Sequence, residues 1–289
     1  MRPCCGARSR PGTMRAMTDS PFVHRNRPGF ACFPAEGGWL VFHSPRETLV
    51  ASTPAGVRGV LDAVDAAVAR GGCAAGFVAY EAAPGLDPVL TTHPGPEGLP
   101  SACFFLYDAG IPVPGEEAPP ARPEDAAFGE WLPAVSPDEY GKALSTIRDY
   151  IAAGDTYQIN HTFPLAGTLR GEPFAAFLAL YANQPSGEAG FLQLGDFAVL
   201  SLSPELFFSL DGDRLETRPM KGTMPRGRWV EEDAARAESL RESDKERAEN
   251  VMIVDLLRND MGRVSVGGSV RVERLFEAER YPTLWQMTS

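Results

Sequence analysis

Lys221 has the residue type and the setting of a candidate nucleophile, because it lies between a proline and a glycine in the stretch Arg-Pro-Met-Lys-Gly-Thr (218–223). Glu205 lies sixteen residues upstream in Ser-Pro-Glu and supplies a carboxylate that could give or take a proton. Lysine amines form covalent intermediates, and carboxylic acids protonate leaving groups. The alternative is an ion pair on the surface, which would contribute about 0–1 kcal/mol and do no chemistry.

A β-hairpin is expected to bring these two residues together. Residues 206–210 and 214–218 are rich in residues that favour strands, and the Asp-Gly-Asp between them is a tight-turn signal. Glu205 enters the first strand and Lys221 follows the second, so both belong to the open end of the hairpin. The sequence therefore predicts that positions 205 and 221 lie close in space.

A long helix is expected after the lysine. Ser243 and Glu246 fit a capping box, with the serine as N-cap and the glutamate three residues into the helix. An apolar run follows at 251–257, and no helix breaker occurs before Gly262. These signals predict a helix over about 244–260.

Glu249 lies on the same face of this helix as buried aliphatic residues such as Ile253. A carboxylate in that position needs a partner, because desolvating it alone costs several kcal/mol. The candidates are Arg247, Arg258 and a hard divalent cation. Asp255 is expected to form a structural pair with Arg258 at i+3.

Four ordered blocks of sequence together resemble one enzyme family. They are Gly-Asp-Thr-Tyr-Gln-Ile-Asn (154–160), Ser-Leu-Ser-Pro-Glu (201–205), Pro-Met-Lys-Gly-Thr (219–223) and Lys-Glu-Arg-Ala-Glu-Asn-Val-Met-Ile-Val-Asp-Leu-Leu-Arg-Asn-Asp (245–260). The resemblance is to the chorismate-utilising enzymes: anthranilate synthase component I, aminodeoxychorismate synthase component I, and the isochorismate and salicylate synthases. It implies an α+β fold in which antiparallel sheets pack face to face with flanking helices.

The residue at position 221 separates the branches of this family. Anthranilate synthases resemble Pro-Ile-Ala-Gly-Thr there, whereas aminodeoxychorismate synthases carry a lysine, as this chain does. The resemblance implies that Lys221 attacks chorismate at C2 while the C4 hydroxyl leaves, and that ammonia then displaces the lysine by attacking C4. The product would be 4-amino-4-deoxychorismate, the precursor of p-aminobenzoate and folate.

The resemblance also implies roles for the other motif residues. Glu205 would protonate the departing hydroxyl, Gly222 and Thr223 would bind substrate, and Glu249 would bind Mg²⁺. Ammonia would come from a glutamine amidotransferase subunit.

Other branches remain as alternatives. Isochorismate and salicylate synthases also place a lysine in this motif, where it serves as a general base that activates water. Residues 76–88 (Gly-Phe-Val-Ala-Tyr-Glu-Ala-Ala-Pro-Gly-Leu-Asp-Pro) resemble the leading region of aminodeoxychorismate synthases and favour that branch. An anthranilate synthase type of enzyme is the remaining catalytic alternative.

The end of the chain departs from the family pattern. Family domains continue through a Gly-rich Pro-Lys stretch, an arginine and a tyrosine that grip carboxylates, and a second Mg²⁺ glutamate. The resemblance therefore implies a catalytic domain that is incomplete at its C-terminus. Two hypotheses follow: a fragment of an active enzyme, or a catalytically inactive remnant that acts only as a binding module.

Composition excludes several classes of partner. The net charge of −11 argues against nucleic acid, which requires clustered Lys and Arg, and no apolar stretch reaches the roughly 18 residues of a membrane span. The five cysteines form no Cys-x-x-Cys pair, so a reducing cytoplasm is expected. The substrate should be a small anion that meets a metal and a few basic groups locally.

Four segments are expected along the chain. They are a disordered leader (1–27), a small N-terminal α+β region (28–110), a Pro-rich linker (111–134) and the N-terminal portion of the chorismate-binding catalytic domain (135–289). Helical periodicity predicts further helices near 55–69, 137–153 and 174–183, and β-rich runs occur at 39–42, 75–80 and 102–107.

Overall fold

The computed structural model describes residues 20–120 and 122–289. The described residues divide into two compact units, one formed by residues 20–120 with 180–289 and the other by residues 122–179.

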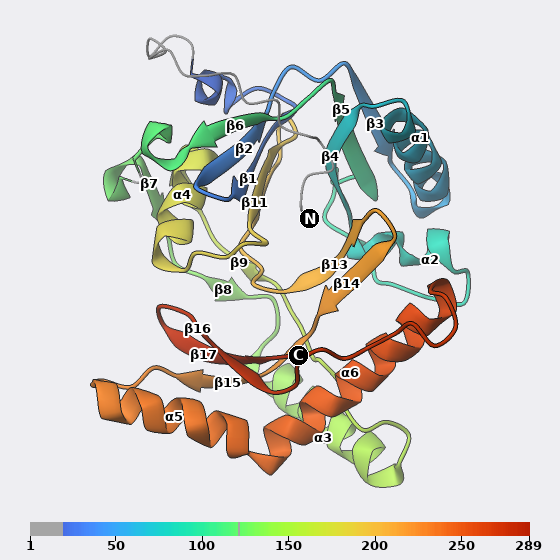
Figure 1. The fold of residues 1–289 in the computed structure, drawn as a ribbon, viewed down its shortest axis with the longest axis vertical. Coiled ribbons are helices and arrows are strands. Elements are labelled where there is room, and N and C mark those ends of the chain that lie inside the picture. Colours follow the sequence, from blue (N-terminus) through green and yellow to red (C-terminus); the bar gives the residue numbers. More distant parts are fainter. Residues whose placement is uncertain (1–19, 121) are drawn as a thin grey trace. The chain divides into compact units, whose positions relative to one another are not determined.

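Two antiparallel sheets form the core of the first unit (Figure 1). The larger sheet has the order β12-β11-β1-β2-β6, with β1 (Phe30–Ala35), β2 (Gly38–Phe42), β6 (Ile111–Pro114), β11 (Gly190–Gln193) and β12 (Ala198–Ser201). The smaller sheet has the order β3-β5-β4, with β3 (Glu47–Ala51), β4 (Cys73–Val78) and β5 (Ala102–Tyr107). The β-rich runs expected near 39–42, 75–80 and 102–107 are thus confirmed as β2, β4 and β5.

The two sheets pack face to face through one apolar cluster. Ala31 and Phe42 from the larger sheet are buried in it with Phe105 and Tyr107 from the smaller sheet. The Tyr107 hydroxyl donates to the Gly29 carbonyl oxygen at 2.8 Å, which satisfies the one polar atom of that side chain. The expected α+β fold with face-to-face antiparallel sheets is confirmed.

The expected linker and domain boundary differ from the observed pairing. Strand β6 lies inside residues 111–134 and pairs with β2, while β11 pairs with β1 although it comes much later in the chain. Pro112 and Pro114 fit β6 because it is an edge strand, where a missing N–H leaves no ladder bond unmade. A proline-rich composition therefore marked an edge strand as well as loops.

The expected leader lies partly outside the described residues, which begin at residue 20. Residues 21–24 form a 3-10 turn, η2 (Pro21–His24), in which Phe22 is buried and its ring lies 6.3 Å from the ring of Phe30. The disordered leader is therefore corrected for residues 20–27, because an apolar anchor holds this part against the core.

Helix α1 (Val57–Ala69) covers the smaller sheet of this unit, as the periodicity near 55–69 predicts. Its residues Val57 and Val60 are buried with Ala51 of β3 and Ala102 of β5. A short helix, α2 (Ala83–Leu86), follows β4. Further 3-10 turns of the chain lie at Pro54–Gly56, Tyr80–Ala82, Gly115–Glu117 and Pro123–Asp125.

The later part of the first unit carries the motif residues. A hairpin of β13 (Leu206–Asp211) and β14 (Arg214–Arg218) leads into a three-stranded antiparallel sheet of order β15-β17-β16. This sheet consists of β15 (Met220–Pro225), β16 (Glu277–Arg280) and β17 (Leu284–Thr288), and it contacts the helices α5 (Val230–Glu242) and α6 (Asp244–Val264). The predicted hairpin and the predicted helix at 244–260 are both confirmed, and α6 continues through Gly262.

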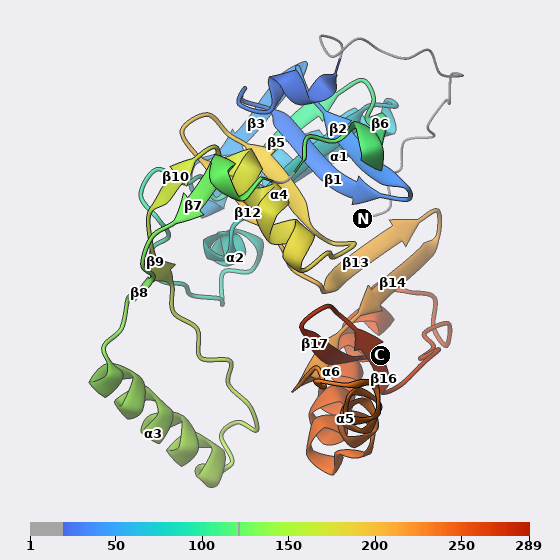
Figure 2. The same cartoon turned by 90° about the vertical axis from the view of Figure 1, so that its left-hand side faces the viewer.

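The second unit contains α3 (Pro137–Ala153) and two small strand pairs (Figure 2). Strand β7 (Ala126–Phe128) pairs with β10 (Leu169–Gly171), and β8 (Leu132–Pro133) pairs with β9 (Leu165–Ala166). A full capping box between Ser136 and Glu139 starts α3, and Gly154 ends it with φ of 82°. The next helix, α4 (Pro173–Asn183), begins in this unit. Both helices were predicted from the sequence.

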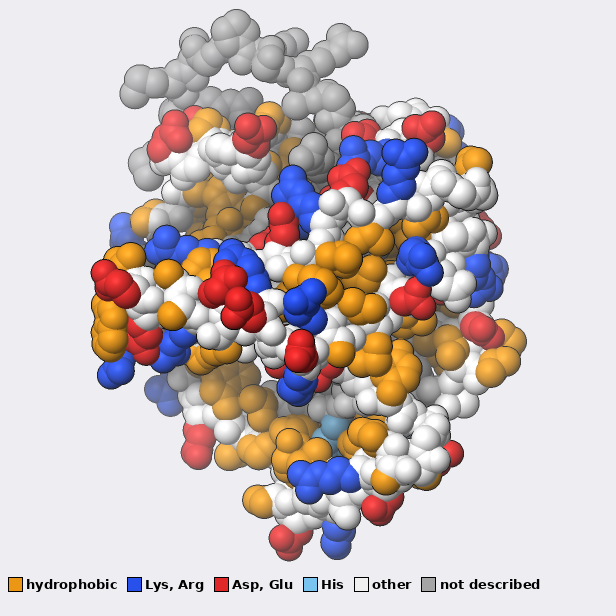
Figure 3. Space-filling view, turned by 60° about the horizontal axis from the view of Figure 1, so that its bottom comes forward, with side chains coloured by type: hydrophobic (Ala, Val, Ile, Leu, Met, Phe, Trp, Pro, Cys, Tyr) orange, Lys and Arg blue, Asp and Glu red, His pale blue; other side chains and the backbone are white. Residues whose placement is uncertain are grey.

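Several large hydrophobic side chains of the first unit are exposed on and beside α5 and α6. They are Trp229, Val230, Val251, Leu256 and Val264. Figure 3 shows one face of the molecule on which hydrophobic side chains gather between charged ones. Exposed apolar surface of this kind is typical of regions that contact another element or another protein. None of the helices in the described part of the chain combines the length and the hydropathy of a membrane-spanning segment.

Candidate active site

Lys221 lies in a β-bulge of strand β15. Met220 pairs with Thr288 and Thr223 pairs with Gln286, so Lys221 and Gly222 together oppose the single residue Met287. A bulge adds one residue to one strand, interrupts the ladder and re-aims the side chain that it carries. The backbone therefore presents Lys221, whose side chain is partly buried, outside the regular strand pairing.

Gly222 makes this bulge possible. Its φ is 99°, which an L side chain rarely adopts, and a Cβ there would lie 3.0 Å from Glu246 Oε2 and 3.3 Å from Leu240 Cδ1. The glycine thus permits the left-handed backbone and also the close approach of β15 to both helices. Glu246 of α6 is consequently brought beside the bulge that carries Lys221.

Glu205 lies at the base of the hairpin, as predicted, and its side chain turns toward the lysine strand. The Met220 N–H donates to Glu205 Oε1 at 3.3 Å, so the carboxylate reaches the residue next to Lys221. Among the ion pairs of the described residues, none joins Glu205 to Lys221. The pair is therefore held together through the backbone of β15, and the surface ion pair considered from the sequence is not formed.

The partner of Glu249 differs from the expected arginines. Lys245 Nζ lies 3.6 Å from Glu249 Oε1. Arg247 instead lies over the ring of Phe276, 4.6 Å from its centroid, and Arg258 pairs with Asp255 at 2.7 Å. The expected Asp255–Arg258 pair is confirmed. Neither arginine reaches Glu249, because each is held by a closer partner.

Glu246 is a candidate site residue that the sequence did not indicate. Lys245 Nζ also lies 3.2 Å from Glu246 Oε1, so one amine contacts two carboxylates. The hydrogen bond to Glu246, together with the charges of Glu246 and Glu249, raises the pKa of Lys245. The available signal was the i, i+3 spacing of the two glutamates, which places them on one helix face.

The capping box predicted at the start of α6 is only half formed. The Glu246 N–H donates to Ser243 Oγ at 3.4 Å, as a capping box requires. The Glu246 carboxylate points to Lys245 and Gly222 rather than back to the serine N–H. A single glutamate thus serves the cap with its backbone and the site with its side chain.

The paired carboxylates fit part of a Mg²⁺ site. Glu246 and Glu249 are both partly buried and already share one positive group. Mg²⁺ is commonly held by one or two carboxylates, with water and substrate completing its shell. Within the described residues, no group of three or more metal-ligating side chains gathers. Both glutamates could therefore hold the ion only with further oxygen ligands.

Thr223 is exposed, and its hydroxyl donates to Gln286 Oε1 at 2.9 Å across the β15–β17 pair.

An open hollow of about 1270 Å³ lies between β14 and α6, but Lys221, Glu205 and Glu249 do not line it. The candidate site is thus the bulge with its neighbours on α6 and the hairpin base.

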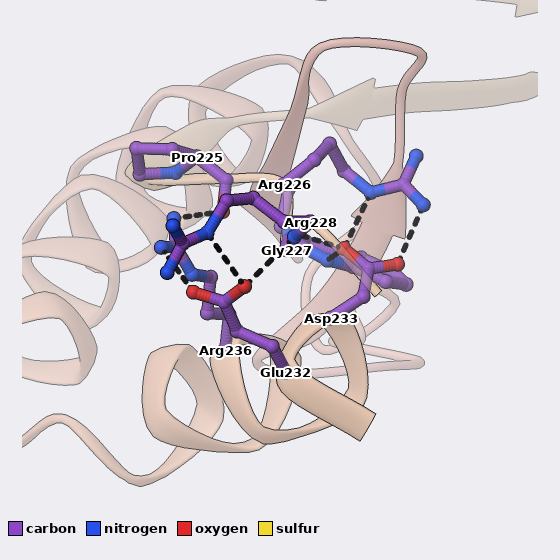
Figure 4. A network of polar contacts seen from close by, with 8 residues as sticks. Pro225, Arg226, Gly227, Arg228, Glu232, Asp233 and Arg236 are labelled. Atoms are coloured by element: carbon purple, nitrogen blue, oxygen red, sulfur yellow. Dashed lines mark hydrogen bonds and ion pairs between the residues drawn. The ribbon is translucent and has the colours of Figure 1, made fainter. Parts of the chain in front are cut away.

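The end of β15 is held by a dense polar network (Figure 4). Asp233 of α5 accepts from Arg226 Nε at 2.7 Å, from Arg226 Nη2 at 2.5 Å and from the Gly227 N–H at 2.8 Å. Trp285 Nε1 of β17 donates to the same carboxylate at 2.9 Å, and Arg226 also donates to the Tyr281 carbonyl at 2.7 Å. These donors, Arg226 first among them, hold the pKa of Asp233 well below its usual range.

Comparison with known proteins identifies the family. The chain belongs to the chorismate binding enzymes, because the model of that family matches residues 34–289. This finding confirms the resemblance carried by the four motif blocks.

Individual relatives fall in two branches of this family. Aminodeoxychorismate synthase component 1 of Escherichia coli (strain K12) is 41% identical over 160 residues, which are 55% of this chain and 35% of that protein. Anthranilate synthase component 1 of Thermus thermophilus is 41% identical over 177 residues, 61% of this chain and 37% of that protein. The matched region is therefore little more than a third of each curated relative, and identity does not separate the two activities.

A solved structure supports the fold. Anthranilate synthase component I from Streptococcus pneumoniae TIGR4 superposes with a TM-score of 0.65 and 24% identity, covering 91% of this chain and 66% of that one. At this level of identity the likeness concerns the fold alone.

Proposed function

We propose that this chain is part of an aminodeoxychorismate synthase component I, which converts chorismate and ammonia to 4-amino-4-deoxychorismate. The observation that carries the proposal is Lys221 in a bulge beside Glu205 and the α6 carboxylates. In the anthranilate synthase branch the corresponding motif resembles Pro-Ile-Ala-Gly-Thr, with alanine at the position of Lys221. A lysine there supplies a nucleophile that the alanine cannot.

Lys221 would act as the covalent catalyst. Its unprotonated amine attacks C2 of chorismate, both ring double bonds shift by one position toward C4, and the C4–O bond breaks. Glu205 gives its proton to the departing hydroxyl, which leaves as water. Ammonia then attacks C4, both double bonds shift back, the C2–N bond breaks with its electron pair going to Lys221, and the proton released by the new amine returns to the Glu205 carboxylate. The enzyme ends the cycle in its starting state.

The position of Glu205 supports its role as proton donor. Its carboxylate reaches the N–H of Met220, one residue from the nucleophile. Gly222 brings the backbone of the bulge close to α6, and Thr223 continues the same strand. These two residues would contact the substrate where it meets Lys221.

Glu246 and Glu249 would hold Mg²⁺. When bound, the ion supplies positive charge for a carboxylate of chorismate, which offsets the repulsion between an anionic substrate and a chain of net charge −11. The Lys245 amine contacts both glutamates without any metal, so it marks a place where these carboxylates accept a cation. Lys245 would have to turn away for the ion to enter.

The ammonia would come from a glutamine amidotransferase subunit. Support for this partner is the wording "component 1" in the names of the relatives, which indicates a protein that works with another component. The reaction would take place in the cytoplasm.

The test is product analysis of the protein with chorismate, Mg²⁺ and ammonium. Formation of 4-amino-4-deoxychorismate is the expected result. Anthranilate as product would favour the second branch, to which the Thermus thermophilus relative belongs, and isochorismate would assign Lys221 to water activation. Chorismate recovered unchanged would support the inactive binding module instead.

A further inference from the structure

We infer that Asp233 is a positioning residue for Lys221: by holding the end of β15 against both α5 and β17, it fixes the register that places Lys221 in the bulge. The inference rests on the proposed role of Lys221. Asp233 itself lies on a different element, the first turn of α5, and acts through the strand that carries the lysine.

A bulge stays in place only when the strand pairing on both of its sides is fixed. If the ladder on one side shifts by one residue, the extra residue is absorbed and every side chain on that side moves to the opposite face. On the near side of Lys221, the pair Met220 and Thr288 is buried and cannot shift without losing its packing. The far side is short, because β15 ends at Pro225.

Asp233 fixes this far side by binding both strands at once. Its carboxylate accepts hydrogen bonds from the Arg226 guanidinium and the Gly227 N–H, and these two residues directly follow β15. It also accepts a hydrogen bond from the Trp285 indole N–H, and Trp285 is the β17 residue that pairs with Met224. A slip of β15 relative to β17 would therefore break either the three hydrogen bonds from Arg226 and Gly227 or the one from Trp285.

The segment that leaves β15 is built to approach α5 closely. A Cβ at Gly227 would lie 2.2 Å from the backbone nitrogen of Asp233, so any other residue would displace the helix from the strand. Neighbouring residues of α5 add two contacts, with Arg236 donating to the Pro225 carbonyl at 3.2 Å and Glu232 accepting from the Arg228 N–H at 2.8 Å (Figure 4). The start of α5 therefore forms hydrogen bonds with three successive peptide units, those between residues 225 and 228.

The ion pair of Arg226 and Asp233 is largely shielded from solvent. The Arg226 and Asp233 side chains are only 17% and 14% exposed, unlike the pair of Arg241 and Glu238 farther along α5, which is 44% and 58% exposed. Removing one partner of a shielded pair leaves the other charge uncompensated. The exposed pair provides a matched control on the same helix.

The small number of lysines allows the reactivity of the Lys221 amine to be measured separately. The chain has three lysines, Lys142, Lys221 and Lys245, so labelling with an amine-reactive ester followed by peptide mass spectrometry reports on each of them. Lys142 on α3 serves as the internal reference. This measurement reads the environment of Lys221 and does not require turnover.

Asp233→Asn is expected to increase labelling of Lys221 relative to Lys142 severalfold and to lower kcat with little change in KM. The reason is that loss of orientation at the reacting amine can cost about 10²-fold in rate without weakening substrate binding. Asp233→Glu, which keeps the charge, should restore part of both signals. Glu238→Gln should match the parent in both.

Folded Asp233→Asn protein with parental labelling and parental kcat would overturn the inference. If this variant does not fold, Trp285→Phe removes a single donor to Asp233, and it should shift both signals in the same direction by a smaller factor. Parental behaviour of that variant would also overturn the inference. A parent protein without turnover but with the expected labelling changes would separate failure of the proposed reaction from failure of the positioning role.

Discussion

At the scale of single residues, the candidate site depends on where an amine and three carboxylates are placed. Lys221 lies in the bulge, Glu205 reaches the neighbouring peptide, and Glu246 and Glu249 share the amine of Lys245. These side chains come from three structural settings, which are the bulge, the hairpin base and the start of α6. The acidic groups can thus serve separate purposes, proton transfer at one end and cation binding at the other.

Lys221→Ala is expected to abolish formation of 4-amino-4-deoxychorismate and to leave chorismate binding largely intact, because the substitution removes the nucleophile and leaves the carboxylates. Chorismate turnover and equilibrium binding measure the two effects. Lys142→Ala, on the exposed surface of α3, is the matched control and should behave as the parent. Parental turnover in the Lys221 variant would refute covalent catalysis by this residue.

Glu249→Gln is expected to raise the Mg²⁺ concentration needed for half-maximal activity, because a neutral amide is a weaker ligand than a carboxylate. Titration of activity with Mg²⁺ measures the shift. Asp255→Asn removes a carboxylate from an exposed ion pair farther along α6 and should leave the titration unchanged. A Glu249→Gln titration that superimposes on the parental one would count against the ligand role.

At the scale of elements, the contacts of β15 with α5, α6 and β17 build the site. The strand is short, and its bulge depends on one glycine whose missing side chain admits Glu246 and Leu240. The helix α6 contributes its first two turns to the site. The same turns carry the cap of the helix, so stability and function share residues here.

Gly222→Ala is expected to destabilise the protein by at least about 1 kcal/mol, because the φ of 99° is unfavourable for alanine and the new Cβ would press on Glu246. Urea unfolding of parent and variant measures the difference. Gly262→Ala is the control: nothing lies within 4 Å of that position, and alanine inside a helix should stabilise by about 0.5–1 kcal/mol. Equal stability of Gly222→Ala and parent would show that the bulge is not strained by a side chain.

At the scale of the whole molecule, the N-terminal core is not a separate piece of sequence. Strand β1 pairs on one side with β2, its neighbour in the chain, and on the other side with β11, whose residues come about 160 positions later. Phe30 and Phe191 are diagonal neighbours across this pair, their ring centroids lie 6.1 Å apart, and both are fully buried. The core therefore forms only when both regions are present.

A fragment of residues 20–134 is expected to lack a cooperative unfolding transition, because it exposes the buried edge of β1. A fragment of residues 20–205 adds β11 and β12 and should recover one. Thermal unfolding followed by circular dichroism, together with binding of a hydrophobic dye, distinguishes the two. Cooperative unfolding of the shorter fragment at the temperature of the longer one would support the boundary that the sequence suggested.

Local signals in the sequence were sufficient for much of the fold. Tyr140 and Ile147 at helical spacing, with Gly154 after them, predicted α3 with its observed end, and the turn at 211–213 predicted the hairpin. The family followed from four motif blocks. These features depend on residues that are close in sequence, so composition, spacing and turn preference contain the necessary information.

Other features depended on residues that are distant in sequence. The bulge at Lys221 exists because β15 pairs with β17, about 65 residues away, and Asp233 matters because it meets both strands. The pairing of β1 with β11 crosses the expected linker for the same reason. Periodicity shows that a strand forms but not which strand it pairs with, because hydrogen-bond partners across a sheet are chosen by packing of the whole core. The sequence by itself therefore determined the candidate nucleophile and its family, and the folded chain determined the backbone that presents it.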